Sequence, residues 1–338
     1  MADLQCRGSL SAAAFITRLE ARPGRCAIMF PSYAELHCLS NFTFLRGASH
    51  PEELAERAAR LGYSALAITD ECSLAGVVRA HVAAKEAGIK LIVGAEVTLR
   101  ALRLVLLATG RDGYGNLSAL ITRARRRSRK GEYRLDLADL DNGLPGCLAL
   151  LLPGTVPDLA HARWLEARFD GRCWIAVELH AGPDDRARLA QLEAYAQQAG
   201  LPLVAAGDVH MHVRARRALQ DTLTAVRLRR PIAQCGHALF PNGECYLRPR
   251  ERLAHIYPPE LLIATLDVAE RCIFSLDSLR YEYPEEIVPA GETPASWLRK
   301  LAEDGFRWRF GAELRSREMK RSNSISMRAG STSVIPRQ

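Results

Sequence analysis

Histidine and carboxylate residues recur just after apolar stretches of this 338-residue sequence, a pattern that suits metal binding. The residues with this placement are His37, Glu71, Glu96, His180, Asp208 and His210. If the apolar stretches are strands of a β/α barrel, these side chains converge, because functional groups gather at the carboxyl ends of such strands. Imidazole suits zinc, and carboxylate suits harder ions such as manganese and magnesium. The sequence therefore predicts a divalent-metal pocket.

Each of these residues also has an explanation that needs no metal. Asp208, and Asp70 beside Glu71, have the position of a residue that caps the following helix. A single histidine at a strand end commonly makes a structural hydrogen bond. The metal hypothesis therefore depends on the convergence of several strand ends and not on any one residue.

The elements that would position this pocket alternate between strand-like and helix-like segments. After a first strand that leads into His37, the expected strands are the apolar runs 63–69, 90–97, 103–109, 147–152, 173–179 and 201–206. The expected helices are a segment between a Ser49 cap and Gly62, and the segments 74–87, 114–127, 159–169, 184–198, 214–228 and 259–271. Glu52 has capping-box spacing from Ser49. This alternation predicts parallel βαβ units, and their number favours a barrel over a small open sheet.

The composition narrows the class of protein. Nine cysteines are scattered without a C-x-x-C pair, which argues against a disulfide framework and favours small buried side chains. The apolar runs are far shorter than the roughly 18 residues that a membrane-spanning helix needs. The N-terminus lacks the charge order and cleavage site of a signal peptide. We therefore expect a cytoplasmic protein with no membrane contact.

The net charge of +8 and the pI of about 9.1 fit a polyanionic partner such as DNA, but they also fit solvated helix faces. The candidates for nucleic-acid contact in the densest basic run are Arg125, Arg126, Arg127, Arg129 and Lys130. No aromatic residue interleaves with them for base stacking, so a solvated helix end is the favoured interpretation. Asp139 and Asp141 have the spacing of a polymerase metal pair, but they lie in a polar connection and we interpret this spacing as chance.

Four segments resemble motifs of the polymerase and histidinol phosphatase (PHP) superfamily. Residues 35–42 are similar to its first motif, 67–76 to its second, 89–96 to a segment with a glutamate ligand, and 207–210 to its closing Asp-x-His. Further stretches resemble most closely the branch of bacterial error-prone DNA polymerases: 33–40, 48–53, 68–81, 208–222, 240–247 and 281–297. The resemblance implies the α/β class, with a distorted seven-stranded, TIM-like β/α barrel followed by the start of a second domain.

The resemblance also implies that several metal ligands are missing. The first motif of the superfamily is His-x-His, whereas His37 is followed here by Leu39, which cannot bind a metal. Arg46 replaces an aspartate of the same motif, and Glu71 stands where a histidine is usual. The residues that keep a ligand type are His37, Glu96, Asp208 and His210, with His180 as a fifth candidate. Because Arg46 repels cations, we expect a vestigial pocket in which zinc, manganese or magnesium binds weakly or not at all.

The same resemblance divides the chain into four parts. We expect a leader at 1–30, a PHP domain at 31–232, a connector with the start of the polymerase core at 233–312, and a disordered Ser- and Arg-rich tail at 313–338. Met29 is a candidate natural start, and the tail resembles the product of a frameshift or a truncation.

Three functions stay open. The first is the PHP scaffold of an error-prone DNA polymerase of translesion synthesis, which would not polymerise alone and whose partners would be DNA and other mutagenesis proteins. The second is a stand-alone metal-dependent phosphoesterase or exonuclease, and the third is a non-catalytic DNA- or protein-binding module. The missing ligands favour the first function over the second.

Overall fold

The computed structural model describes residues 30–280 and 288–310 of the chain. The expected leader, apart from Phe30, and the expected tail lie outside the described residues. The chain divides into two compact units, one up to Leu279 and one from Arg280 onwards.

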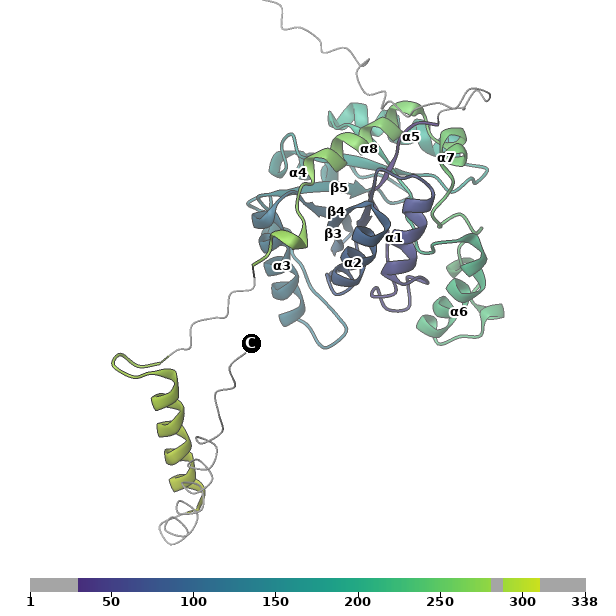
Figure 1. Cartoon of the computed structure of the whole chain (residues 1–338). Helices are drawn as coiled ribbons and strands as arrows, with labels where there is room; N and C mark the ends of the chain where they lie inside the picture. The colour runs from purple at the N-terminus through teal and green to yellow at the C-terminus, as the bar shows by residue number, and fades with distance from the viewer. Residues whose placement is uncertain (1–29, 281–287, 311–338) are drawn as a thin grey trace, which may run out of the picture. The chain divides into compact units, whose positions relative to one another are not determined.

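The first unit is built on one seven-stranded sheet, in which each strand pairs with its neighbours in the sequence (Figure 1). The strands are β1 Ala34–Glu35, β2 Ala65–Ile68, β3 Lys90–Leu99, β4 Leu102–Ala108, β5 Cys147–Leu152, β6 Cys173–Glu178 and β7 Leu203–Ala206. The two edges of the sheet meet just past β1 and β7. There Leu39 N donates to Val209 O at 2.8 Å, and Val209 N donates to His37 O at 3.0 Å. These bonds nearly close the sheet, which confirms the expected distorted seven-stranded barrel.

Strand β4 runs antiparallel to both β3 and β5, so the expectation of parallel βαβ units is wrong at this point. Only Arg100 and Ala101 connect β3 to β4. A parallel crossover needs a dozen or more residues, so two residues can form only a hairpin. Arg100 adopts a left-handed φ of 56° to make this turn.

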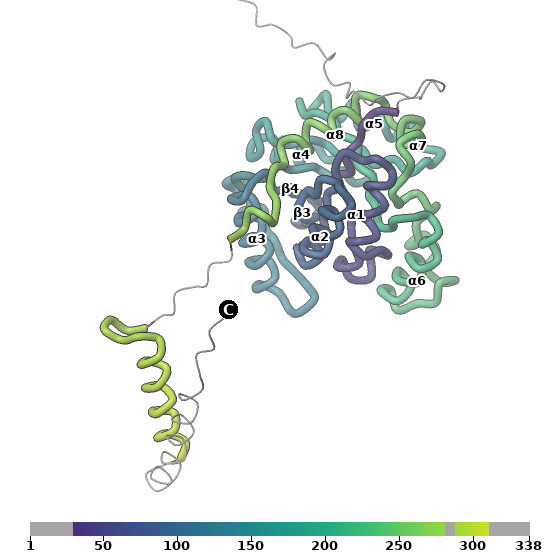
Figure 2. The backbone as a smooth tube through the Cα atoms, in the orientation of Figure 1, coloured from purple at the N-terminus to yellow at the C-terminus, as the bar shows by residue number. Residues whose placement is uncertain are grey.

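The described residues of the first unit form eight α-helices, of which α1 and α2 lie side by side (Figure 2). They are α1 Pro51–Arg60, α2 Val77–Ala87, α3 Arg111–Arg126, α4 Leu159–Arg168, α5 Asp185–Ala199, α6 Arg217–Leu228, α7 Arg250–Ile256 and α8 Pro259–Arg271. All the expected helices are present, and α7 is an addition. The cap of α1 is His50, whose N–H donates to Glu53 at 2.9 Å. The expected cap Ser49 instead bonds to His212 at 2.8 Å, because the chain turns into the helix one residue later.

The strands are buried on both sides, as continuous apolar runs predict. In β5, Leu148, Leu150 and Leu152 face the barrel interior, while the alternate residues pack towards the helices. Helix α8 packs against β7 and β1 and contributes Val268 to the interior cluster. Its Thr265 hydroxyl accepts a hydrogen bond from Ala34 N, the first amide of β1, at 3.0 Å. Helix α8 therefore covers the amino end of the barrel, and the closed carboxyl end carries the polar residues.

The second unit is helical over residues 294–310, where Leu298 and Trp308 are exposed. The domain boundaries stay a prediction, although α7 and α8 belong to the same compact unit as the barrel. Among the helices in the described part of the chain, none combines the length and the apolar character that crossing a bilayer requires.

Candidate functional site

His37 lies at the centre of the polar end of the barrel, immediately after β1, and is fully buried. Its Nε2 is 3.0 Å from Glu96 Oε2 in β3, and its Nδ1 is 2.6 Å from Glu178 Oε1 at the end of β6. Burial alone would lower the pKa of His37, but Glu178 and Glu96 raise this pKa to about 10. Both ring nitrogens therefore act as donors, and His37 is an imidazolium that links two carboxylates.

Glu96 is surrounded by cationic groups. Besides His37, it accepts from Arg46 Nη1 at 3.1 Å and from Arg103 Nη2 at 3.2 Å. Burial would raise the pKa of Glu96, but these three cations hold it well below its usual range. The Arg46 Nη1 also lies 2.6 Å from Glu71 Oε2. The guanidinium of Arg46 thus bridges two carboxylates that could otherwise share a divalent cation.

Asp208 follows β7 and forms the second centre of the site. It adopts a left-handed φ of 45°, which is uncommon for a residue other than glycine and orients its carboxylate. Its Oδ1 is 3.0 Å from His210 Nε2, and its Oδ2 is 3.6 Å from His180 Nε2. Burial would raise the pKa of Asp208, but His210 and His180 hold it well below its usual value.

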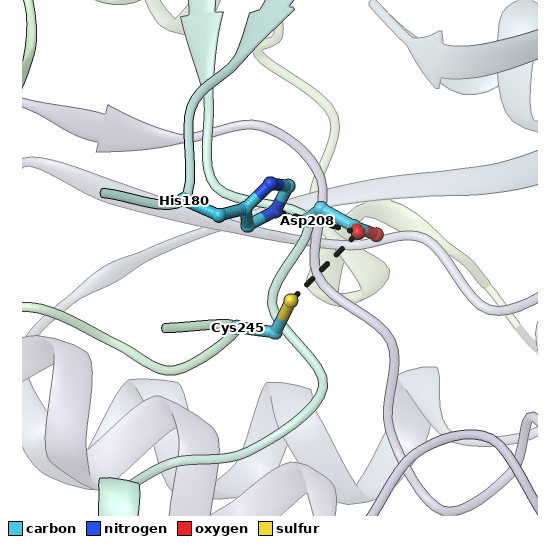
Figure 3. Close-up of side chains that lie close together, drawn as sticks. All are labelled: His180, Asp208 and Cys245. Atoms are coloured by element: carbon cyan, nitrogen blue, oxygen red, sulfur yellow. Dashed lines mark hydrogen bonds and ion pairs between the residues drawn. The ribbon is translucent and has the colours of Figure 1, made fainter. Parts of the chain in front are cut away.

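Cys245, from the segment before α7, completes this second centre (Figure 3). Its Sγ is 3.9 Å from Asp208 Oδ2. In Figure 3 the ring of His180 and the sulfur of Cys245 both point towards the Asp208 carboxylate. Burial, and next the charge of Asp208, raise the pKa of the Cys245 thiol well above its usual value.

The two halves of the site differ in whether they suit a metal. On the Glu71 and Glu96 side, Arg46 already supplies the positive charge, so these residues do not fit an added cation. On the Asp208 side, donor atoms of His180, Asp208 and Cys245 lie within 4.8 Å of one another. The His180 Nε2 atom is buried and has no hydrogen-bond partner within the described ranges. These residues fit an ion that accepts mixed nitrogen, oxygen and sulfur ligands. A second group, His37, Glu178 and Asp208, is equally compact, but both ring nitrogens of His37 are already bonded.

All the predicted site residues lie at this end of the barrel, with Glu71 joined to the others through Arg46. Asp70 contributes differently, because its carboxylate accepts from Ser40 N and Thr43 Oγ1 and orders the loop after β1. The sequence prediction of the site omitted Glu178, although its place at a strand end was a usable signal. It also omitted Cys245, whose position depends on a contact between segments far apart in the sequence. The identity of the site residues as metal ligands stays a prediction.

The basic run at the end of α3 is partly structural. Arg125 donates to the carbonyl oxygens of Cys72 and Glu71 at 3.2 and 3.1 Å. Arg127 pairs with Asp139 at 2.7 Å, which explains this aspartate without any polymerase chemistry. The remaining candidates are exposed and do not belong to the site: Arg126, Arg129 and Lys130. Their contact with nucleic acid stays a prediction.

A family model described as PHP domain matches residues 35–200 of the chain. The chain is 63% identical over 288 residues to an error-prone DNA polymerase of Dechloromonas aromatica, covering 83% of this chain and 28% of that protein. It is 58% identical over 284 residues to the error-prone DNA polymerase of Methylococcus capsulatus, covering 83% of this chain and 27% of that protein. The chain thus spans little more than a quarter of the length of these relatives.

Among solved structures, one similar chain is an amidohydrolase from Chromobacterium violaceum, with 18% identity and a TM-score of 0.41. The match covers 53% of this chain and 88% of that one. Another is a chain assigned as a metal-dependent phosphoesterase from Bifidobacterium adolescentis, with 17% identity and a TM-score of 0.39. This match covers 54% of the present chain and 89% of the other one.

Proposed function

We propose that this chain, which carries a PHP domain at residues 35–200 and is similar to error-prone DNA polymerases, is the scaffold part of such a polymerase. The whole protein would extend primers across damaged template, with DNA and other mutagenesis proteins as its partners. This part would support the polymerase without catalysing either polymerisation or hydrolysis. A role at DNA also implies action in the cytoplasm, and Arg126, Arg129 and Lys130 are the candidates for contact with the DNA backbone.

The observation that carries this proposal is the position of Arg46 between Glu71 and Glu96. In metal-dependent hydrolysis, bound metals stabilise the attacking and leaving oxygens and lower the pKa of a water. A guanidinium supplies positive charge at the same place but has no open coordination position. Arg46 therefore holds the loop after β1 against β2 and β3, and it does so as a permanent part of the protein.

The alternative of a metal-dependent phosphoesterase rests on the Asp208 half of the site. A metal there would be held by Asp208 and His180, and it would supply an activated water. Catalysis would also need a group that binds the substrate phosphate, but Arg46 and Arg103 are already paired with carboxylates. This pairing disfavours the alternative.

An activity assay on the purified full chain tests the proposal. The chain is incubated with single-stranded DNA and with a chromogenic phosphodiester, in the presence of manganese or zinc. We expect no turnover above that of the Asp208→Ala variant. Metal-dependent turnover that disappears in Asp208→Ala would overturn the scaffold role.

The scaffold role itself is tested in a chimaera. In the Dechloromonas aromatica relative, the 288 matched residues are replaced by the corresponding residues of this chain. We expect the chimaera to extend a primer at a rate close to that of the parent protein. A chimaera that folds and binds DNA but does not extend primers would contradict the proposal.

A further inference from the structure

A surface hollow of about 670 Å³ lies beside the last turn of α3. It is lined by Arg123, Arg127, Arg134, Asp136, Ala138 and Asp139. Arg123 belongs to α3 and Arg127 caps its carboxyl end, whereas Arg134 belongs to the loop that follows. This loop returns to the helix, because Arg134 N donates to Ala124 O at 3.2 Å. Guanidinium groups from two segments therefore line the same hollow.

Hydrogen bonds fix the loop after α3 to the rest of the unit. The Tyr133 hydroxyl donates to Glu71 Oε1 at 3.0 Å and accepts from Thr98 N at 3.0 Å. Arg125 donates to Glu132 O at 3.4 Å, and its guanidinium lies 5.3 Å from the centre of the Tyr133 ring. The backbone that carries the loop side of the hollow is therefore ordered before any ligand binds.

The positive charge of the hollow is only partly compensated. Asp139 accepts from Arg127 Nη1 at 2.9 and 2.7 Å and from Asp136 N at 3.0 Å. Arg134 Nε lies 3.6 Å from Asp136 Oδ2, in a pair whose side chains are 71% and 39% exposed. Within residues 30–280 and 288–310, Arg127 Nη2 and the whole Arg123 guanidinium have no hydrogen-bond partner. Donors of two arginines are therefore available to an anion, and Asp139 orients one of them.

We propose that this hollow binds a backbone phosphate of a DNA strand. Arg123 and Arg134 donate to the phosphate from two segments, and Arg127 adds a third guanidinium. Guanidinium groups bind phosphate through paired N–H donors, which suits a hollow lined by three of them. The inference rests on the proposed function, because it assigns the place where a part that acts at DNA holds the strand. The same positive surface includes the exposed residues Arg126, Arg129 and Lys130.

The position of Arg134 favours a phosphate site over a solvated helix end. The helix dipole stabilises cations in the last turn of α3, which accounts for Arg123 but not for a residue of the loop. Bringing these like charges together costs free energy, which the negative charge of a bound phosphate offsets. Among the described residues, the lining contains no aromatic side chain, so the hollow contacts the backbone of the strand and not its bases.

The test measures how the full chain binds a fluorescein-labelled single-stranded oligothymidine and a labelled duplex of the same length. Fluorescence anisotropy gives the affinity at salt concentrations between about 50 and 200 mM. Each phosphate contact contributes about 0.7 for a single strand, and about 0.9 for a duplex, to the slope of log affinity against log salt. The double variant Arg123→Gln/Arg134→Gln should therefore lower the slope by about 1.4 on the single strand and weaken binding at least ~10-fold at the lowest salt.

The matched control is the double variant Arg60→Gln/Arg163→Gln, which removes the same charge from exposed positions on α1 and α4. Its slope should stay close to that of the wild type, and both double variants should keep the wild-type Tm because all four arginines are exposed. A larger loss in Arg123→Gln/Arg134→Gln on either probe supports the site, and the probe that shows it identifies the strand as single or paired. Equal slopes and affinities of the two double variants on both probes would overturn the inference.

The chimaera described above separates this inference from the scaffold role. A chimaera that extends primers, together with equal DNA binding by the two double variants, would refute the phosphate site alone. A chimaera that folds but does not extend primers, together with a loss of binding only in Arg123→Gln/Arg134→Gln, would refute the scaffold role alone.

Discussion

Replacing Arg46 by methionine is the sharpest test of how the carboxylates at the barrel end are balanced. The change keeps most of the side-chain volume and removes the positive charge between Glu71 and Glu96. Glu96 is 1% exposed, so water cannot take the place of the lost donor. Removing one partner of a buried ion pair typically costs about 3–5 kcal/mol.

The expected cost in this protein is smaller than that range. Glu96 keeps its contacts with His37 and Arg103, at 3.0 and 3.2 Å, and the Glu71 side chain is 28% exposed. We therefore expect a loss of about 2–4 kcal/mol in the free energy of unfolding. For a unit of this size, each 1 kcal/mol corresponds to roughly 2–4 °C in Tm. The expected decrease in Tm is then on the order of 5–15 °C.

The measurement is thermal and urea unfolding of the full chain. The control is Arg60→Met, which removes an ion pair with Glu56 whose two side chains are 68% and 51% exposed, and which should cost less than ~1 kcal/mol. Manganese should restore part of the stability of Arg46→Met, because it can replace the missing charge. At ten times its Kd, an ion adds about 1.4 kcal/mol. If Arg46→Met and Arg60→Met have the same Tm and the same free energy of unfolding, with or without manganese, Arg46 does not balance the charge of the carboxylates.

Two further predictions concern protonation and packing. Because the pKa of His37 is raised to about 10 from about 6.5 in the unfolded chain, its stabilising effect is complete below about pH 6.5 and is lost as the pH rises through 10. Urea midpoints measured across this interval should fall more steeply in the wild type than in His37→Asn, and parallel curves would contradict the assignment of an imidazolium. In α3, Gly113→Ala should destabilise strongly, because the new Cβ would lie 1.8 Å from Gly146 O. Gly115, two residues later, faces open space, so Gly115→Ala should stabilise the protein by about 0.5–1 kcal/mol. The Tm measured by calorimetry should therefore fall in Gly113→Ala and rise in Gly115→Ala. A Tm that falls in both variants, or rises in both, would refute the packing argument.

The fold was largely predictable because its signals are local. An apolar run of six residues such as 147–152 favours a buried strand because it is too short for a typical helix. Helix ends such as Gly88 and Gly200 adopt the left-handed φ that glycine permits. The antiparallel β4 was missed because periodicity shows the strand and not its direction. The gap between the expected strands 90–97 and 103–109 held that information, since residues 98–102 are too few for a crossover.

The site was less predictable because its contacts join distant segments. Strand-end histidines and carboxylates indicated where the pocket lies. The positive charge of Arg46 indicated that this residue would weaken metal binding in the pocket. The identity of its partners, Glu71 and Glu96, depends on how the loop after β1 packs against the end of β2 and against β3. Cys245 had no local signal at all, because an isolated cysteine in a polar segment has no periodicity that indicates which residue it faces.

The hydrogen bond between Ala34 N and Thr265 has a consequence for how the protein is made. The bond joins residues 231 positions apart, so the first strand emerges from the ribosome long before the helix that covers its end of the barrel. At roughly 5–20 residues per second, that delay is about 10–50 s. During this interval the amino end of β1 lacks the helix that later covers it. We therefore expect the nascent chain to depend on chaperones that shield exposed apolar surface until α8 has been synthesised.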